Sequence, residues 1–227
     1  DMKREKDHLG MLLGKARDYA RANGFKGTFL IEPKPMEPTK HQYDFDSETV
    51  IGFLRHYGLD KDFKLNIEVN HATLAQHTCQ HELQVAVDSG FLGSIDANRG
   101  DYQNGWDTDQ FAIDPTEMRY LLYIMLQNGG FSGGGGFNLD TKVRRQSTDL
   151  VDLFYAHISG IDTLAKALIE AEAMLKEGQL KSFVEERYSG WDQGEGKEIL
   201  NGARTIEQVA DFVAQKDLKP KPVSGRQ

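Results

Sequence analysis

Short apolar runs that end in an acidic residue recur along the first two thirds of the chain, and they constrain its fold more than any other feature. The runs cover residues 27–32, 64–69, 92–96 and 137–140, and their acids are Glu32, Glu68, Asp96 and Asp140. Each run is short and is bounded by proline, glycine or polar residues, which is typical of a buried strand. The pattern therefore predicts a carboxylate at or near the C-terminal end of each strand.

An amphipathic helical pattern over residues 3–23 precedes the first strand, and further patterns over residues 46–58, 72–88 and 114–127 separate the strands. Asp46 or Ser47 is expected to cap the second of these helices, and Asp114, followed by Pro115, is expected to cap the last. Strands that alternate with helices predict a parallel α/β sheet. Residues 1–147 would supply about four of the eight units of a TIM (β/α)8 barrel. Because barrel enzymes build their sites at the C-terminal ends of the strands, the strand-terminal carboxylates should converge on one mouth.

Beyond residue 148 the pattern changes to helices alone, over residues 148–157, 161–177, 179–188 and 205–215. We therefore expect residues 148–216 to form an extended all-helical C-terminal arm. Residues 217–227 are rich in lysine, proline and polar residues, and they are expected to be a disordered tail.

Carboxylates gathered at one mouth need a positive charge between them, because like charges in a poorly solvated pocket raise one another's pKa. His71 follows Glu68 by three residues, and Asp107 and Asp109 lie in the next acidic loop. A set of oxygen ligands with one imidazole suits Mg²⁺, Mn²⁺ or Co²⁺ better than a metal that prefers thiolates. Two adjacent ions are expected, with Glu68 as the bridge between them.

The acidic loop at residues 94–109 has two interpretations that the loop alone leaves equally open. It contains Asp96, Asp101, Asp107 and Asp109. Aspartate, asparagine and glycine are common turn residues, so the loop is either a solvated turn or part of a cation site.

Lys34 also has two interpretations of equal weight. It is either a surface lysine paired with Glu37 or a cation at the mouth that hydrogen-bonds a substrate oxygen. Pro33 and Pro35 flank it and hold the segment stiff.

Other features are assigned structural roles. His77 and His81 are spaced as on one helix face, but no His-Glu-x-x-His motif is present, which favours a helix face over a zinc site. Cys79 is expected to be a small buried residue. A single cysteine predicts no disulfide framework and favours a reducing, cytoplasmic setting. The glycine-rich residues 129–136 lack the ending of a phosphate loop.

The formal net charge of −8 disfavours nucleic acid and anionic membranes as partners. The sequence contains no apolar run long enough to span a bilayer.

Six motifs run in order through nearly the whole chain. They are Glu32-Pro-Lys-Pro, Leu65-Asn-Ile-Glu-Val-Asn-His71, Ile95-Asp-Ala-Asn-Arg-Gly100, Gly105-Trp-Asp-Thr-Asp109, Phe137-Asn-Leu-Asp-Thr-Lys-Val-Arg-Arg145 and Arg187-Tyr-Ser-Gly-Trp191. Together they are highly specific, and the chain resembles the C-terminal portion of xylose isomerases of the longer-chain bacterial class.

The resemblance implies two metal sites. The first would be formed by Glu32, Glu68, Asp96 and Asp140 and would hold hydroxyl oxygens of an open-chain sugar. The second would be formed by Glu68, His71, Asp107 and Asp109, with a water that moves a proton between sugar oxygens.

The resemblance further implies that Lys34, Glu32, His71 and Asp140 contact the sugar. Lys34 would be the catalytic contact to the carbonyl oxygen while a hydride shifts between C1 and C2. The reaction would convert D-xylose to D-xylulose, with D-glucose to D-fructose as a further candidate, and would need no nicotinamide. The helical arm would wrap a neighbouring subunit in a homotetramer.

Nothing in the chain corresponds to the family's earlier half, which carries a His–Asp pair implicated in ring opening and the aromatic walls of the sugar pocket. The opening Asp1-Met2 also suggests a piece of a longer protein. Half a barrel would leave two unpaired strand edges, so we expect it to pair with its N-terminal half or with a second copy.

The sequence is compatible with more than one function. The first is a metal-dependent isomerase that is inactive without its N-terminal half, and the second is a non-catalytic metal-binding half-barrel that self-associates. A sugar epimerase or a phosphodiesterase-type nuclease is a weaker alternative.

Overall fold

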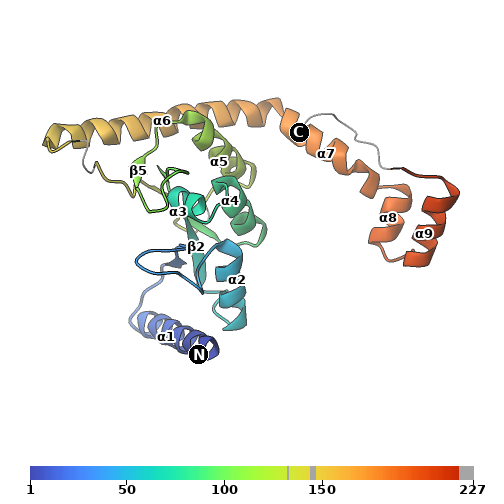
Figure 1. The fold of residues 1–227 in the computed structure, drawn as a ribbon, viewed down its shortest axis with the longest axis horizontal. Helices are drawn as coiled ribbons and strands as arrows, with labels where there is room; N and C mark the ends of the chain where they lie inside the picture. The colour runs from blue at the N-terminus through green and yellow to red at the C-terminus, as the bar shows by residue number, and fades with distance from the viewer. Residues whose placement is uncertain (132, 144–146, 220–227) are drawn as a thin grey trace. The chain divides into compact units, whose positions relative to one another are not determined.

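The computed structural model describes residues 1–131, 133–143 and 147–219 and shows a mixed α/β chain (Figure 1). The chain divides into two compact units, residues 1–173 and residues 174–227. Most of the predicted tail, from residue 220 onward, lies outside the described residues, as do Arg144 and Arg145 of the fifth motif.

The first unit contains a parallel sheet at the places where buried strands were predicted. Its strands are β1 (Phe29–Ile31), β2 (Phe63–Glu68), β3 (Leu92–Asp96) and β6 (Phe137–Asn138), in the order β1-β2-β3-β6. The register pairs Glu68 with Asp96 and Asp96 with Asn138, so these polar side chains share one edge. The parallel α/β sheet is confirmed, whereas its being half of a barrel stays a prediction.

Two of the predicted helices begin at the expected capping residues, and helices form before and between the strands. They are α1 (Met2–Ala22), α2 (Ser47–His56), α3 (Val69–Leu74), α4 (Cys79–Asp88) and α5 (Pro115–Gln127). Asp46 caps α2 by accepting the Thr49 N–H at 2.8 Å, and Asp114 caps α5 by accepting the Thr116 N–H at 2.8 Å. Helix α4 contacts α2, α5 and strand β2, and it places Leu83 in the core.

The continuous helix predicted over residues 72–88 is wrong, because the chain breaks between α3 and α4. Gln76 adopts a left-handed φ of 62°, and Thr78 is extended and accepts the His81 N–H at 3.2 Å. A threonine in this geometry starts a new helix. His77 therefore lies in the connection and not on the helix.

The acidic loop forms a small hairpin that the sequence did not predict. Strands β4 (Asn98–Arg99) and β5 (Gln110–Phe111) pair in antiparallel fashion and bring the two ends of the loop together. Strand β4 contacts α3, so the hairpin holds the loop close to the helix that carries His71.

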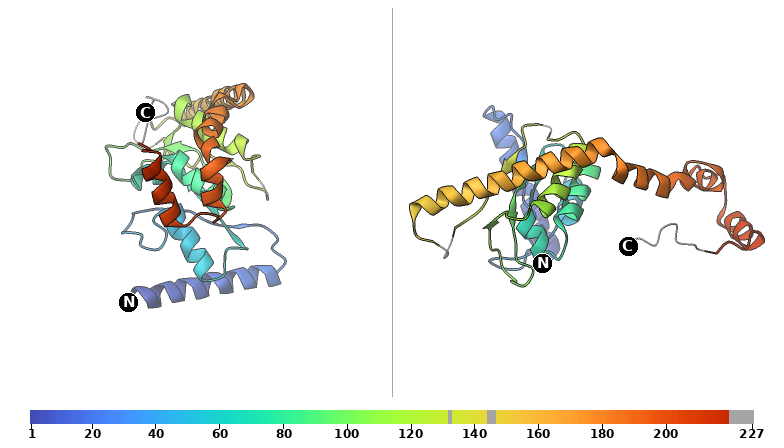
Figure 2. Two further views of the ribbon diagram at one scale, coloured as in Figure 1. Left: turned by 90° about the vertical axis from the view of Figure 1, so that its right-hand side faces the viewer. Right: turned by 90° about the horizontal axis from the view of Figure 1, so that it is seen from above.

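Helix α6 (Leu150–Glu177) is continuous, whereas two separate helices were predicted there. Gly160, which falls between the two predicted helices, is buried inside α6, where an added Cβ would lie 3.3 Å from Phe111 Cδ1. The glycine permits a close approach of helix and hairpin. Farther along, Arg119 of α5 pairs with Glu170 of α6 at 3.0 Å, and both figures show these helices close together (Figures 1 and 2).

The second unit contains short helices. They are α7 (Gln179–Tyr188), the 3-10 turn η2 (Ser189–Trp191), α8 (Gly194–Leu200) and α9 (Ile206–Gln215). Helix α8 was not predicted, since Gly194 and Gly196 lower its helix propensity. Arg204 supports it through Glu195 at 2.7 Å and Glu198 at 2.8 Å. None of the described helices is long and apolar enough to cross a membrane.

Replacing Gln76 with glycine should raise the free energy of unfolding by about 0.5–1 kcal/mol, because glycine adopts a positive φ without the penalty of a Cβ. Chemical denaturation of the purified chain measures this change. The matched control is Gln84→Gly inside α4, which should lower the free energy of unfolding by about 1 kcal/mol. Equal losses at both positions would contradict the role assigned to Gln76.

Candidate metal centre

The residues predicted to be metal ligands come together at the C-terminal edge of the sheet. Their ligand atoms form overlapping groups, each within 4.8 Å, that have Glu68 in common: Glu32, Glu68 and His71; Glu68, Asp96 and Asp140; Glu68, Asp107 and Asp109. Glu32 directly follows β1, Glu68 and Asp96 end β2 and β3, and Asp140 follows β6 by two residues. Geometry of this kind can hold cations, and the role of each residue as a ligand stays a prediction.

Glu68 lies at the centre of this cluster and is almost completely buried, with its side chain 1% exposed. Its carboxylate faces His71 Nε2 at 3.0 Å and accepts a hydrogen bond from Asn98 Nδ2 at 2.7 Å. Because strand β2 ends at this residue and α3 begins at the next, Glu68 and His71 project from the junction of a strand and a helix. This position allows Glu68 to bridge two ions.

His71 lies among three carboxylates. Its Nε2 is 3.0 Å from Glu68 and 3.2 Å from Asp107, and its Nδ1 is 3.3 Å from Glu32. Burial alone would lower the pKa of His71, but hydrogen bonds to Asp107 and Glu68 raise this pKa to about 9. Without a metal, the imidazole holds a proton and serves as a counter-charge; to bind a metal it must release that proton.

The acidic loop divides into a turn at Asp101 and a buried segment at Asp107 and Asp109. Asp101 forms a solvated turn, accepting the Gln103 N–H at 2.9 Å and an Asn104 amide hydrogen at 3.1 Å. Asp107 and Asp109 instead turn inward, with side chains 10% and 4% exposed. The turn interpretation is therefore confirmed for Asp101, whereas a cation site at Asp107 and Asp109 stays a prediction.

Lys34 points into the cluster and not along the surface. Its Nζ donates to Asp107 Oδ2 at 2.7 Å, whereas Glu37 Oε2 is 4.0 Å away. Burial alone would lower the pKa of Lys34, but the hydrogen bond to Asp107 raises it, so the ammonium stays charged. Lys142 contacts Asp109 in the same cluster, and the sequence did not single it out.

The positive groups of the cluster are too few to balance the charge of its carboxylates. Burial and the neighbouring Glu68 raise the pKa of Glu32 to about 7. Burial also raises the pKa of Asp109 and Asp140. Burial alone would likewise raise the pKa of Asp107, but His71 and Lys34 hold it well below its usual range. Divalent cations would relieve this repulsion, and the oxygen-rich donor set with one imidazole fits Mg²⁺, Mn²⁺ or Co²⁺.

Asparagine side chains orient the carboxylates, and sequence analysis missed them. Asn66 Nδ2 donates to Glu32 at 2.8 Å and to Asp96 at 2.7 Å. Asn138 Nδ2 donates to Asp96 at 3.0 Å, and Asn98 holds Glu68 as described above. A sequence pattern could have revealed them, because an amide and a carboxylate stand two residues apart in Asn66-x-Glu68, Asp96-x-Asn98 and Asn138-x-Asp140. Alternate residues of an extended chain point to the same side.

Fold and cluster together define the class of the protein: an α/β chain with a candidate divalent-metal centre at the carboxyl ends of parallel strands. Comparison with known proteins narrows this class. Residues 184–227 match the family described as XylA2 C-terminal domain.

The whole chain is 62% identical to xylose isomerase of Bacteroides thetaiotaomicron and 61% identical to that of Phocaeicola vulgatus, covering 51% of each. It is 56% identical to xylose isomerase 2 of Xanthomonas campestris, covering 50% of that protein. The chain is thus a homologue of the xylose isomerases and spans about half the length of the curated relatives it matches.

The substitution Glu68→Gln should lower the affinity for each cation that the cluster binds by more than about 10-fold, because Glu68 belongs to each group of ligand atoms. Isothermal titration with Mn²⁺ measures the affinities. Asp101→Asn is the matched control in the acidic loop and should leave them unchanged. Unaltered Mn²⁺ binding by the Glu68 variant would contradict the prediction that Glu68 bridges two ions.

Mn²⁺ affinity should rise steadily between pH 6 and pH 8. With the pKa of His71 raised to about 9 and that of Glu32 to about 7, both groups carry protons at the lower pH and must lose them on binding metal. Titration calorimetry in buffers of different ionisation enthalpy should show proton release. An affinity independent of pH, with no protons released, would contradict these assignments.

Proposed function

We propose that the chain supplies the metal-binding half of an aldose–ketose isomerase that converts D-xylose to D-xylulose. The observation that carries this proposal is the ligand cluster centred on Glu68, with the ammonium of Lys34 2.7 Å from Asp107. The relatives that match the whole chain are named xylose isomerase, which supports the same activity. D-glucose is proposed as a second substrate.

The ligand groups divide between two ions. Glu32, Glu68, Asp96 and Asp140 would hold one ion, and Glu68, His71, Asp107 and Asp109 would hold the other. Mg²⁺, Mn²⁺ or Co²⁺ would supply Lewis-acid polarisation of sugar oxygens when bound. Asn66, Asn98 and Asn138 keep the carboxylates facing the site through the hydrogen bonds described above.

Lys34 is the proposed catalytic contact. Its ammonium, kept protonated by Asp107, would donate a hydrogen bond to the sugar carbonyl oxygen and stabilise the negative charge that develops there. The hydride moves between C1 and C2 of the same molecule, so the electrons balance without an external redox cofactor. Glu32, His71 and Asp140 lie close enough to the same centre to contact sugar hydroxyls.

The active assembly needs more chain than is present here. Among the described strands, β1 and β6 stand at the two ends of the sheet, each paired on one side only. We propose that the remaining part of the enzyme, or a second copy of this chain, completes the barrel.

Residues 148–216 are proposed as an oligomerisation arm within a homotetramer. Apolar side chains exposed along α6, among them Leu150, Phe154, Ile158 and Ile161, support this role because such a surface favours contact with another subunit.

The first test measures D-xylose conversion by the chain alone and by the chain co-expressed with the uncovered part of the Bacteroides thetaiotaomicron relative. Both are assayed with Mn²⁺ present, and D-glucose is tested in parallel. Activity of the mixture supports the isomerase. Metal binding and self-association without turnover in the mixture would favour the non-catalytic half-barrel instead.

In the complemented enzyme, Lys34→Ala should lower kcat by about 10²-fold or more, the loss seen when a group that stabilises a developing oxyanion is removed. Mn²⁺ affinity should change little, because Lys34 is not among the ligands. Lys40→Ala, an exposed lysine six residues along the same segment, is the control and should retain activity. Unchanged turnover in the Lys34 variant would exclude a catalytic role.

A further inference from the structure

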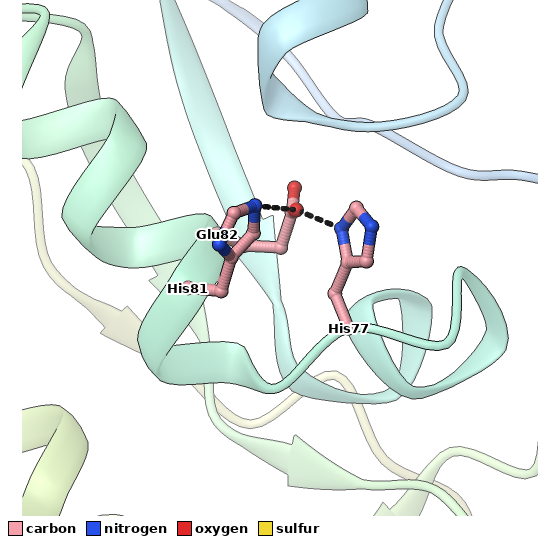
Figure 3. Close-up of side chains that lie close together, drawn as sticks. All are labelled: His77, His81 and Glu82. Atoms are coloured by element: carbon pink, nitrogen blue, oxygen red, sulfur yellow. Dashed lines mark hydrogen bonds and ion pairs between the residues drawn. The ribbon is translucent and has the colours of Figure 1, made fainter.

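A second group of potential metal ligands, His77, His81 and Glu82, lies at the start of α4 (Figure 3). One ligand atom from each of these residues lies within 4.8 Å of the other two. His77 Nδ1 is 2.5 Å from Glu82 Oε1, and His81 Nε2 is 3.9 Å from the same oxygen. Figure 3 shows the two imidazoles approaching this carboxylate from opposite sides.

The break between α3 and α4 produces this convergence. Thr78 is the N-cap of α4, which makes His77 the residue before the cap and Glu82 the fourth residue of the helix. Apolar residues at these two positions often pack against each other across a helix start, and His77 and Glu82 meet across the same two positions. His81 lies one position before Glu82, and the centroids of the two histidine rings are 4.7 Å apart. A continuous helix would not have brought His77 to Glu82 in this way.

Glu82 is fixed before any ligand arrives. Its side chain is only 5% exposed, and its second oxygen, Oε2, accepts the Ser47 N–H at 2.8 Å. This hydrogen bond comes from the first residue of α2 and leaves Oε1 facing the imidazoles. Outer hydrogen bonds of this kind orient carboxylate ligands in metal sites.

The donor set indicates which cation would bind. Two imidazole nitrogens with one carboxylate oxygen suit Zn²⁺ and related late transition-metal ions, whereas Mg²⁺ prefers oxygen ligands alone. Bonds of about 2.0–2.1 Å in a tetrahedral site place ligand atoms about 3.3 Å apart, a value between the two distances observed here. The side chains of His77 and His81 are 30% and 51% exposed, so an ion can enter from solvent and keep a water as fourth ligand.

We propose that His77 Nδ1, His81 Nε2 and Glu82 Oε1 form a transition-metal site of the Zn²⁺ class, separate from the carboxylate cluster centred on Glu68. The site would connect the start of α4 to the start of α2 through Glu82. This reverses the interpretation drawn from sequence, in which the two histidines were a helix face.

A structural ion pair between His77 and Glu82 is the competing explanation, and His81 distinguishes the two. At 3.9 Å its Nε2 is too distant for a hydrogen bond to Glu82, so His81→Gln leaves the pair intact. If the residues form only an ion pair, this variant should behave as wild type towards metals. If they form the proposed site, it loses one of three protein ligands.

The test counts Zn²⁺ bound by the full chain in excess Mg²⁺, using calorimetry and elemental analysis. Wild type should bind one more Zn²⁺ than the double variant His77→Gln/His81→Gln. In the single variant His81→Gln, the affinity for this additional Zn²⁺ should fall by more than about 100-fold, because even the outer-shell partners of a ligand contribute about 10- to 100-fold to metal affinity. His8→Gln, an exposed histidine of α1, is the matched control and should bind as wild type does.

Nitrogen-15 spectra of the imidazoles identify the ligating atoms directly. Addition of Zn²⁺ should shift His77 Nδ1 and His81 Nε2 in wild type, and circular dichroism checks that each variant remains folded. Equal Zn²⁺ stoichiometry in wild type and the double variant, or no shift at these two nitrogens, would overturn the proposal.

Discussion

Repulsion between carboxylates at the ends of parallel strands is the constraint on which this structure depends. The parallel register sets Glu68 opposite Asp96, and β1 and β6 bring Glu32 and Asp140 to the same edge. A fold under selection for stability alone would not gather these acids, because burial raises the free energy of each ionised group. The protein offsets part of this cost with the ammonium groups of Lys34 and Lys142 and the imidazole of His71.

Neutral amides contribute in a different way. Asn66, Asn98 and Asn138 donate hydrogen bonds to the carboxylates without adding charge, so they fix orientation while leaving the negative potential in place. A lysine at any of these positions would cancel part of the negative charge and compete with a cation. The arrangement preserves the negative potential that would attract a divalent ion and prevents the acids from turning away from one another.

Patterns within short segments predicted much of the fold, and contacts between distant segments account for what was missed. Apolar runs ending in acids located the strands, and Asp46 and Asp114 located helix starts. The hairpin of β4 and β5 escaped prediction because its strands are two residues each. The break predicted between residues 157 and 161 was wrong, because Gly160 allows a close contact with Phe111, which is far away in sequence. The convergence of Glu32, Glu68, Asp96 and Asp140 was predictable from strand ends, whereas the asparagines that bind them required attention to alternate residues.

Cys79 makes the start of α4 accessible to a direct kinetic measurement. It is the only cysteine in the sequence, it is 2% exposed, and burial raises the pKa of its thiol. A thiol reagent can therefore react only when this part of the chain opens, and the labelling rate reports that local opening. Because Cys79 lies between His77 and His81, the same thiol monitors the segment that joins α3 to α4, without any label being engineered into the protein.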